Sequence, residues 1–432
     1  MQNCDLIIHG AGQLITCASN GKPKRLTEMQ NVGLVENGAV AVSNGKIAAV
    51  GKSDEILREF EGETTIDASG KVVSPGFVEC HTHIVFAGNR LNEFELKIKG
   101  ADYLEILRSG GGIISTVRKT REASIEDLIE QSRQRLDKML ALGITTAEVK
   151  TGYGLDIETE LKMLEVIFEL DKTHEIDLIP TFLPAHAVPF ADFRLLDPNR
   201  SNEEIADLYT DLICDEMLPR AKETLNSQLS TLNCFVDVFC EKNAFNLEQS
   251  RKVLETAKSL GFGIKAHVDE FTNIGGARMA IELGATSIDH LDAISEEEIE
   301  LLARSKTVGV VTPTVNFNFG STEFADARKL IDAGCAVALS TDYNPGSAPC
   351  PSLPNAMAIA CRYQKFLPSE AFNAATINAA FAIGLGDQIG SIEVGKQADI
   401  LIFDSKDYRE IAYEFGGNLV EKVIKKGKII VR

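Results

Sequence analysis

Five of the seven histidines in this 432-residue chain could bind a metal or carry protons, because of where they fall. Each lies at or just beyond the end of a short apolar run: His81, His83, His186, His267 and His290. His81 and His83 are two positions apart, so in an extended chain both imidazoles point to the same side. This pair offers two nitrogen ligands to one metal ion.

Asp342 adds a carboxylate to this set, since it follows another apolar run in Ser340-Thr341-Asp342. Imidazole and carboxylate ligands suit zinc or iron and leave room for a water molecule. A bound divalent metal lowers the pKa of its water to about 7, so the chemistry indicated is hydrolysis. Any one of these histidines alone is more often a hydrogen-bonded core residue, and the joint pattern is what indicates a metal site.

Parallel strands would bring these side chains together, because the carboxyl ends of such strands meet on one face. Eight apolar runs are strand candidates: residues 72–80, 145–149, 178–183, 235–240, 263–266, 287–289, 308–311 and 337–339. Helical periodicity separates most of them, as at residues 125–142, 158–170, 247–260 and 296–303. The alternation predicts an α/β fold, a (β/α)8 TIM barrel with insertions.

A doubly wound sheet is the alternative architecture. It would ordinarily carry a glycine-rich phosphate loop. Neither Gly10-Ala11-Gly12 nor Gly110-Gly111-Gly112 continues into a dinucleotide or nucleotide-binding pattern. These glycines are expected in turns.

The two ends of the chain read as short strands instead. Residues 5–8, 38–42 and 46–50 alternate with turns, and Asn44-Gly45 is a strong hairpin signal. Residues 398–403, 420–424 and 428–431 repeat this pattern around Lys426-Gly427. We expect residues 1–70 and 390–432 to form one small β-sandwich domain and residues 71–389 to form the barrel.

Composition narrows the class of protein. Hydrophobic residues make up 44% and charged residues 25% of the chain, as in ordinary globular proteins. A net charge of −19 argues against nucleic acid as a partner. Nine cysteines without a Cys-x-x-Cys pair suggest reduced thiols, and neither a signal peptide nor a membrane span is apparent. The sequence therefore predicts a cytoplasmic protein with no membrane association.

Two segments resemble the metal-dependent amidohydrolase superfamily. They are residues 73–83 (VSPGFVECHTH) and residues 390–400 (GSIEVGKQADI), taken together with His267, His290 and Asp342. The resemblance covers nearly the whole chain. Shorter motifs narrow it to the imidazolonepropionase family: FAGNR at 86–90, KTGYG at 150–154, Pro184-Ala185-His186, HVDEF at 267–271 and DYNPGS at 342–347.

The resemblance implies a set of site residues. The metal would be held by His81, His83, His267 and Asp342. The substrate would be faced by Arg90, Tyr153, His186, Glu270, Asn344, Gly346 and Ser347. The metal would be one divalent ion, zinc or iron, and the protein a homodimer.

The implied substrate is an anionic cyclic amide, 4-imidazolone-5-propanoate, which water opens to N-formimidoyl-L-glutamate in histidine degradation. Glu270 and His290 are the expected acid–base groups, with Asp342 mainly a ligand that could also take the proton. Arg90 offers a planar fork for the propanoate carboxylate. Tyr153, with Tyr103, would add hydroxyl donors, and His186 would donate to the ring carbonyl.

Three alternatives stay open at this stage. Two-metal relatives bridge their ions near the end of strand four, where Glu241 and Lys242 lie here. Another amidohydrolase, such as a purine or pyrimidine aminohydrolase, would share the metal ligands without needing Arg90. A non-catalytic scaffold on this fold would have lost metal ligands, whereas all four metal-ligand positions of this chain hold a histidine or an aspartate.

Overall fold

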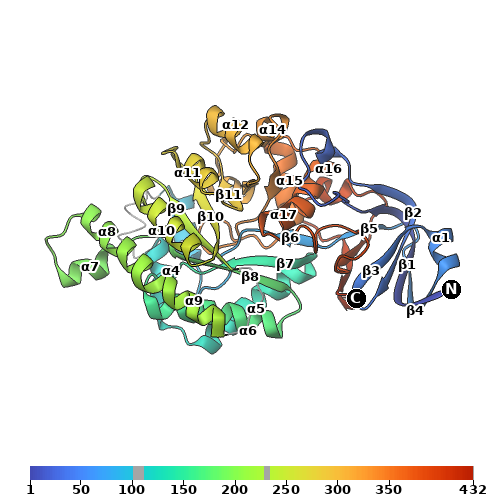
Figure 1. The fold of residues 1–432 in the computed structure, drawn as a ribbon, viewed down its shortest axis with the longest axis horizontal. Helices are drawn as coiled ribbons and strands as arrows, with labels where there is room; N and C mark the ends of the chain where they lie inside the picture. Colours follow the sequence, from blue (N-terminus) through green and yellow to red (C-terminus); the bar gives the residue numbers. More distant parts are fainter. Residues whose placement is uncertain (101–110, 228–233, 432) are drawn as a thin grey trace.

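Eight parallel strands form a barrel in the computed structural model of the protein, which describes residues 1–100, 111–227 and 234–431 (Figure 1). In chain order they are β6 (Phe77–Glu79), β7 (Ile144–Lys150), β8 (Asp177–Ala185), β9 (Phe235–Cys240), β10 (Gly263–Val268), β11 (Ser287–His290), β12 (Val308–Val311) and β13 (Val337–Leu339). Each pairs with the next along the chain. The expected α/β barrel is confirmed.

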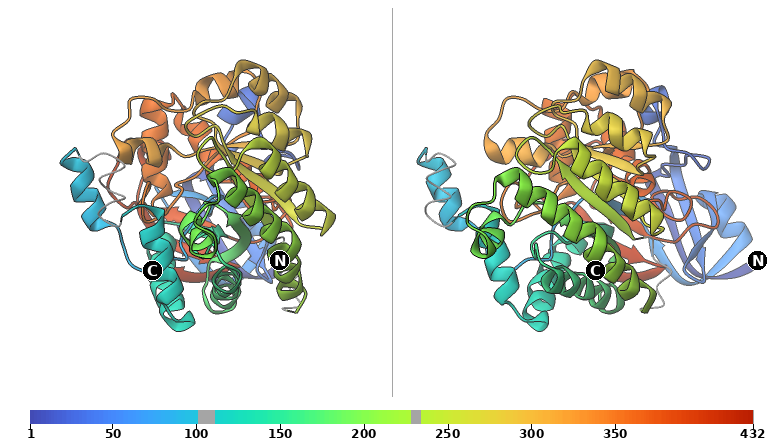
Figure 2. Two further views of the ribbon diagram at one scale, coloured as in Figure 1. Left: turned by 90° about the vertical axis from the view of Figure 1, so that its left-hand side faces the viewer. Right: turned by 60° about the vertical axis from the view of Figure 1, so that its left-hand side comes forward.

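Helices cross over between the strands and surround the barrel (Figure 2). Those that follow the strands include α5 (Ile125–Ala141), α6 (Ile157–Thr173), α9 (Leu218–Ser227), α10 (Leu247–Ser259), α11 (Gly276–Glu282), α12 (Glu296–Arg304), α14 (Ala327–Asp332) and α15 (Leu353–Tyr363). Six of them begin at a side chain that accepts a backbone N–H of the first turn: Ser124, Asp156, Asn246, Ser295, Asp326 and Ser352. Such caps satisfy donors that have no partner within the helix.

Further helices lie in the connections. They are α2 (Leu91–Ile98), α4 (Ile113–Glu122), α7 (Phe190–Leu196), α8 (Asn202–Leu212), α13 (Pro313–Phe319), α16 (Pro368–Ala374), α17 (Ile377–Ala382) and α18 (Glu410–Tyr413). Within the described residues, no helix is long and apolar enough to cross a membrane.

Both chain ends build a second eight-stranded sheet, beside which the two termini lie (Figure 1). Its strands are β1 (Gln2–Ile15), β2 (Leu34–Ser43), β3 (Lys46–Lys52), β4 (Phe60–Asp67), β5 (Val72–Pro75), β14 (Ile400–Phe403), β15 (Val420–Lys425) and β16 (Lys428–Val431), with α1 (Ser53–Glu59) alongside. The first half of β1 pairs with β4 and the second with β5, across a bulge between Ile8 and Ala11. The sheet encloses its own apolar cluster, which fits the expected β-sandwich. The Asn44-Gly45 turn joins β2 to β3 as predicted.

One strand prediction was wrong. Residues 72–80 form two strands, because β5 belongs to the small sheet and only β6 enters the barrel. Gly76 separates them: its N–H donates to Asp399 O at 2.9 Å, and a side chain there would collide with Thr145. The chain therefore leaves the small sheet and enters the barrel at Gly76. The domain limits 1–70 with 390–432 and 71–389 remain a proposal.

Candidate metal centre

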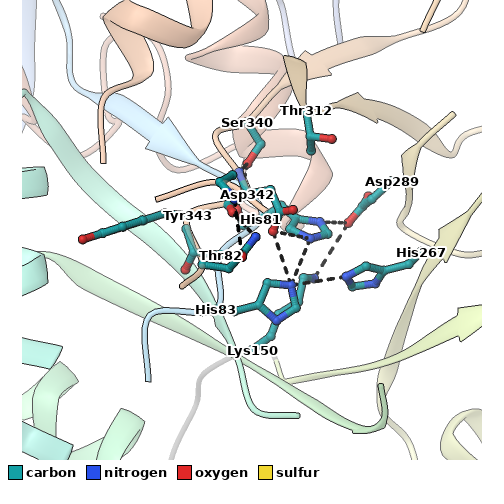
Figure 3. A network of polar contacts seen from close by, with 12 residues as sticks. His81, Thr82, His83, Lys150, His267, Asp289, Thr312, Ser340, Asp342 and Tyr343 are labelled. Carbon is teal, nitrogen blue, oxygen red and sulfur yellow. Dashed lines mark hydrogen bonds and ion pairs between the residues drawn. The ribbon is translucent and has the colours of Figure 1, made fainter. Parts of the chain in front are cut away.

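Four ligand atoms converge at the carboxyl ends of the barrel strands (Figure 3). His83 Nε2 lies 3.3 Å from the Nε2 atoms of both His81 and His267. Asp342 Oδ1 lies 3.5 Å from the Nε2 atoms of His81 and His83. Ligand atoms placed ~2.0–2.1 Å from a tetrahedral zinc ion are about 3.4 Å apart. The spacing therefore fits a metal ion.

Two of these imidazoles are oriented by buried carboxylates. His81 Nδ1 lies 2.6 Å from Asp289 Oδ2, and His267 Nδ1 lies 3.1 Å from Asp237 Oδ2. Because a carboxylate accepts, Nδ1 carries the proton in His81 and its Nε2 keeps the lone pair. The contact of His267 Nδ1 with Asp237 is close but lacks hydrogen-bond geometry. Carboxylates commonly fix metal-binding histidines in this way.

The charge balance of the cluster also fits a cation. Burial lowers the pKa values of His81 and His83 well below their ordinary range, so both rings are neutral. Burial raises the pKa of Asp342 well above its ordinary value, and its Oδ1 is buried without a hydrogen-bond partner among the described residues. A divalent metal would supply both the missing partner and the missing positive charge.

The backbone bends sharply where the strands end. Four non-glycine residues there have left-handed backbone angles: Asp269 (φ 55°), His290 (φ 84°), Leu291 (φ 69°) and Asp342 (φ 50°). This conformation is costly for residues with a Cβ atom, and it clusters at functional sites.

His290 and Glu270 lie beside the ligand cluster. His290 Nε2 is 4.0 Å from Glu270 Oε2, and His290 Nδ1 is 3.1 Å from Thr312 Oγ1. His290 Nε2 is buried without a hydrogen-bond partner in the described part of the chain. Burial, with the nearby Asp342, raises the pKa of Glu270 well above its ordinary value. His290 also falls within metal-binding distance of His81 and His267.

Arg90 is held in place and is not a solvated surface charge. Its side chain is only 13% exposed, and its Nη1 lies 3.7 Å from Glu93 Oε1. Its Nε donates to Thr116 Oγ1 at 3.0 Å. The guanidinium packs against Gly346, where a Cβ atom would come 2.8 Å from Arg90 Cζ. The fold thus brings Arg90 together with the loop after β13.

His186 and Tyr153 lie next to the ligands. The His186 ring stacks on His83 with centroids 4.9 Å apart, and Tyr153 lies 5.4 Å from His186. His186 Nδ1 is 2.9 Å from Gly152 O, so Nδ1 must be the donor and Nε2 an acceptor. Burial lowers the pKa of His186 to about 3, so the ring stays neutral. This geometry differs from the expectation that His186 donates to the substrate.

Asn344 uses its side chain to build the loop after β13. Its Nδ2 donates to Asp342 O at 2.8 Å and to Ser347 Oγ at 2.7 Å. Its Oδ1 accepts the N–H groups of Gly346 and Ser347, each at 2.8 Å. All four of its hydrogen-bonding positions are occupied. Asn344 therefore shapes the loop, whereas sequence reasoning had it facing the substrate.

Sequence reasoning assigned no role to five charged residues inside the barrel. They are Glu148, Lys150, Asp237, Lys265 and Asp289, all fully buried. Lys150 Nζ lies 2.7 Å from Glu148 Oε1 and 2.8 Å from Asp237 Oδ2. Burial opposes the charge on Lys150, but Asp237, Glu148 and Asp289 hold its pKa above the ordinary value. The sequence did carry a signal for these residues, because each is a charged residue within a barrel strand.

Glu241 and Lys242 do not join the ligand cluster. Glu241 accepts the N–H groups of Phe271 and Thr272 at 3.0 and 3.1 Å, and Lys242 is exposed. Among the described residues, the groups able to hold a metal all contain His81. This geometry favours a single ion. Tyr103 lies outside the described residues.

Comparison with known proteins gives one consistent group of relatives. A profile of the Amidohydrolase family matches residues 242–430. The imidazolonepropionase of Chloroflexus aggregans is 50% identical over 434 aligned residues, which cover 100% of this chain and 99% of the relative. That of Alkaliphilus oremlandii is 46% identical, with 99% of this chain and 98% of the relative covered. That of Geobacillus kaustophilus is also 46% identical, with the same coverage.

Solved structures share the fold at low identity. An adenosine deaminase from Xanthomonas campestris with bound zinc has a TM-score of 0.72 at 21% identity and covers 100% of this chain and 93% of its own. A triazine hydrolase variant has a TM-score of 0.73 at 17% identity, with 99% and 94% covered. At such identities the likeness concerns architecture alone.

Proposed function

The chain belongs to the imidazolonepropionase family of amidohydrolases, and from that premise we propose which residues carry its reaction. The enzyme hydrolyses the cyclic amide C–N bond of 4-imidazolone-5-propanoate to give N-formimidoyl-L-glutamate in histidine degradation. The observation that carries this function is 50% identity to such an enzyme along the entire chain. No observation favours an aminohydrolase or a non-catalytic scaffold.

We assign the metal site to His81, His83, His267 and Asp342. Four of their six pairs of ligand atoms lie 3.3–3.5 Å apart: His81–His83, His83–His267, His81–Asp342 and His83–Asp342. We propose one divalent ion per chain, zinc or iron, because imidazole and carboxylate suit both. When bound, such an ion supplies the Lewis acidity that makes the hydrolytic water nucleophilic at neutral pH.

Proton transfer falls to His290 and Glu270. His290 Nε2, which has no hydrogen-bond partner among the described residues, lies 4.0 Å from Glu270 Oε2, so the two groups flank one position at the edge of the ligand cluster. A proton taken from water there can be returned to the leaving ring nitrogen without crossing bulk solvent. Asp342, whose Oδ1 is directed at the imidazoles, serves mainly as a ligand.

Substrate recognition rests on the groups around the cluster. Arg90 would bind the propanoate carboxylate through two hydrogen bonds. Its Nε already donates to Thr116, so these bonds would come from the other N–H groups of the guanidinium. His186 Nε2 would accept a ring N–H, because Nδ1 is committed to Gly152. The Tyr153 hydroxyl, Gly346 and Ser347 would complete the pocket wall.

The test measures metal content and turnover of 4-imidazolone-5-propanoate by the purified protein. We expect about one zinc or iron per chain, and we expect His83→Ala to lose both metal and activity. Full metal content with normal turnover in His83→Ala would remove this residue from the ligand set. Absence of turnover in metal-loaded wild-type protein would overturn the function.

We also propose a cytoplasmic homodimer that binds neither nucleic acid nor membranes. The acidic net charge of −19 supports the absence of nucleic-acid binding. Light scattering of the purified protein should give a mass twice the 47.0 kDa of one chain. A monomer at micromolar concentration would contradict the dimer.

A further inference from the structure

The seam between β6 and β13 carries three of the four proposed ligands. His81 and His83 follow β6, and Asp342 follows β13. No ladder pairs these two strands in the described part of the chain, although every other neighbouring pair in the barrel has one. The described contacts include a single bridge, Thr82 to Tyr343, where His83 N donates to Tyr343 O at 2.9 Å. Side chains also cross the seam: the Ser340 hydroxyl lies 2.9 Å from His81 O.

The Glu79 carboxylate lies across this seam. Its Oε2 accepts Thr341 Oγ1–H at 2.7 Å, and Thr341 N lies 3.2 Å away. Its Oε1 accepts the Ser340 hydroxyl and lies 3.4 Å from His81 N. One carboxylate thus ties the backbone just before Asp342 to the backbone of His81. In Figure 3, Ser340 lies beside Asp342 and His81.

Glu79 makes no ion pair among the described residues, and burial raises its pKa to about 7 against the hydrogen bonds from Ser340 and Thr341. It is fully buried, and no Lys or Arg nitrogen lies within ion-pair distance of it among the described residues. Burying a carboxylate is costly unless its oxygens are well hydrogen-bonded. An apolar side chain would fill this place in the core at lower cost but would remove the hydrogen bonds from Ser340 and Thr341 to this position across the seam.

We propose that Glu79 is a positioning residue that sets the distance between the His81–His83 pair and Asp342, and thereby the metal affinity. It touches neither substrate nor ligand atoms and acts through the backbone on both sides of the seam. The inference rests on the proposed ligand assignment. It goes beyond that assignment because it gives a role in metal binding to a residue that is not itself a ligand.

Glu160 provides a matched control within the same barrel. It is also a fully buried glutamate, and it accepts the N–H groups of Gly152, Gly154 and Leu155 at 2.7–2.9 Å. These bonds shape the loop that carries Tyr153, next to the substrate position. The two glutamates have the same chemistry and burial, but one holds the metal half of the site and the other the substrate half.

The experiment compares Glu79→Gln with Glu160→Gln. Zinc affinity is measured by competition with a chromophoric chelator, and the Co²⁺-loaded proteins give absorption spectra that report ligand geometry. An amide turns an NH₂ group toward the Ser340 and Thr341 donors, so Glu79→Gln should weaken zinc binding about 10- to 100-fold. Its cobalt spectrum should change while KM stays near wild type. Glu160→Gln should raise KM and leave zinc affinity and the cobalt spectrum unchanged.

Three outcomes would overturn the proposal. The first is wild-type zinc affinity and cobalt spectrum in Glu79→Gln. The second is an equal loss of zinc affinity in both glutamine variants, which would indicate general loosening of the barrel. If Glu79→Gln does not fold, Thr341→Val removes the 2.7 Å hydroxyl bond at constant shape and should weaken zinc binding in the same direction. The third outcome that would overturn the proposal is wild-type zinc affinity in Thr341→Val.

His83→Ala, measured in the same assay, separates a failure of the ligand assignment from a failure of the proposed role of Glu79. If His83→Ala keeps wild-type zinc affinity, the ligand assignment fails. If it loses zinc while Glu79→Gln does not, the assignment stands and only the role of Glu79 fails.

Discussion

At the residue scale, buried charged side chains lie behind the imidazoles of the proposed centre. Asp289 and Asp237 face the Nδ1 atoms of His81 and His267, and Lys150 Nζ lies 3.8 and 2.8 Å from the same two carboxylates. Burial opposes the charge on Asp237, but His267 and Lys150 hold its pKa well below the ordinary value. Burial raises the pKa of Asp289, against the effect of Lys265 and Lys150. Mutating such supporting groups typically costs about 10- to 100-fold in metal affinity or activity.

His290 and Glu270 can be separated from the ligands by mutation. We expect Glu270→Gln and His290→Ala to keep the metal and to lose about 10²- to 10⁴-fold in kcat, the usual contribution of a positioned acid or base. Metal analysis and steady-state kinetics on the same preparations check this. Wild-type kcat in either variant would exclude that residue as an essential proton carrier, and loss of metal from His290→Ala would make it a ligand.

Arg90 is the residue on which recognition of the propanoate depends. A guanidinium grips a carboxylate with two parallel hydrogen bonds, whereas an ammonium is a single flexible charge. We therefore expect Arg90→Lys to lower kcat/KM and Arg90→Ala to lower it further, with metal content unchanged in both. The control is a substrate analogue that lacks the carboxylate. An equal penalty for substrate and analogue would show that Arg90 does not read the carboxylate.

At the scale of elements, the site forms where the connection after β6 meets the connection after β13. Gly346 has no side chain because the Arg90 guanidinium occupies that space. Asn344 fixes the turn that presents Gly346. Recognition of the substrate carboxylate therefore depends on two loops that are about 250 residues apart and that only barrel closure brings together.

Replacing Gly346 tests this contact. The backbone of Gly346 needs no left-handed angle, so Gly346→Ala should leave the loop intact and displace Arg90 by collision. We expect a higher KM with unchanged metal content. The double variant with Arg90→Ala should be no worse than Arg90→Ala alone, because both changes remove one interaction. Additive losses in this cycle would mean that Gly346 acts independently of Arg90.

At the scale of the whole molecule, buried charges join the barrel to the small sheet. Lys425 of β15 is 1% exposed, and its Nζ lies 2.8 Å from Asp177 Oδ2 of β8 and 2.7 Å from Asp399 Oδ2. Lys426 Nζ lies 2.6 Å from Asp177 Oδ1 but is 52% exposed. The cluster lies at the start of β8, away from the strand ends that carry the ligands, so it should affect stability and not catalysis.

We expect Lys425→Met to lower the free energy of unfolding by about 3 kcal/mol, the low end for breaking one partner of a buried pair. Denaturant unfolding measures this, and kcat should be unchanged. Lys426→Met is the control, and it should cost about 1 kcal/mol or less because an exposed pair contributes little. A smaller effect for Lys425→Met than for Lys426→Met would contradict this account of the cluster.

The ion pair between Lys425 and Asp177 predicts that the free energy of unfolding depends on pH. Burial opposes the charge on Asp177, but Lys425 and Lys426 outweigh it and hold the pKa of Asp177 below its ordinary value. A depressed carboxyl pKa stabilises the fold above the unfolded pKa, about 4, and this contribution is lost as the pH falls further. The difference between wild type and Lys425→Met should therefore hold above about pH 5 and shrink below about pH 4. A constant difference down to pH 3 would exclude Asp177 as the partner.

The sequence alone was enough for the order of strands, the barrel and the residues proposed as ligands. Strands β9, β12 and β13 begin and end where predicted. This succeeds because alternation and helical periodicity are local, and because the carboxyl ends of parallel strands must share one face.

Tertiary structure alone decided the partners of these residues. His81 and Asp289 are 208 positions apart, and no local pattern predicts that they meet at 2.6 Å. The accepting nitrogen of His186, the saturated side chain of Asn344 and the bridge made by Glu79 depend likewise on contacts between distant segments. A hydrogen bond depends on the angle and separation of two groups to within a few tenths of an ångström. Periodicity in one chain specifies only which face a side chain occupies, and the closed barrel supplies the rest.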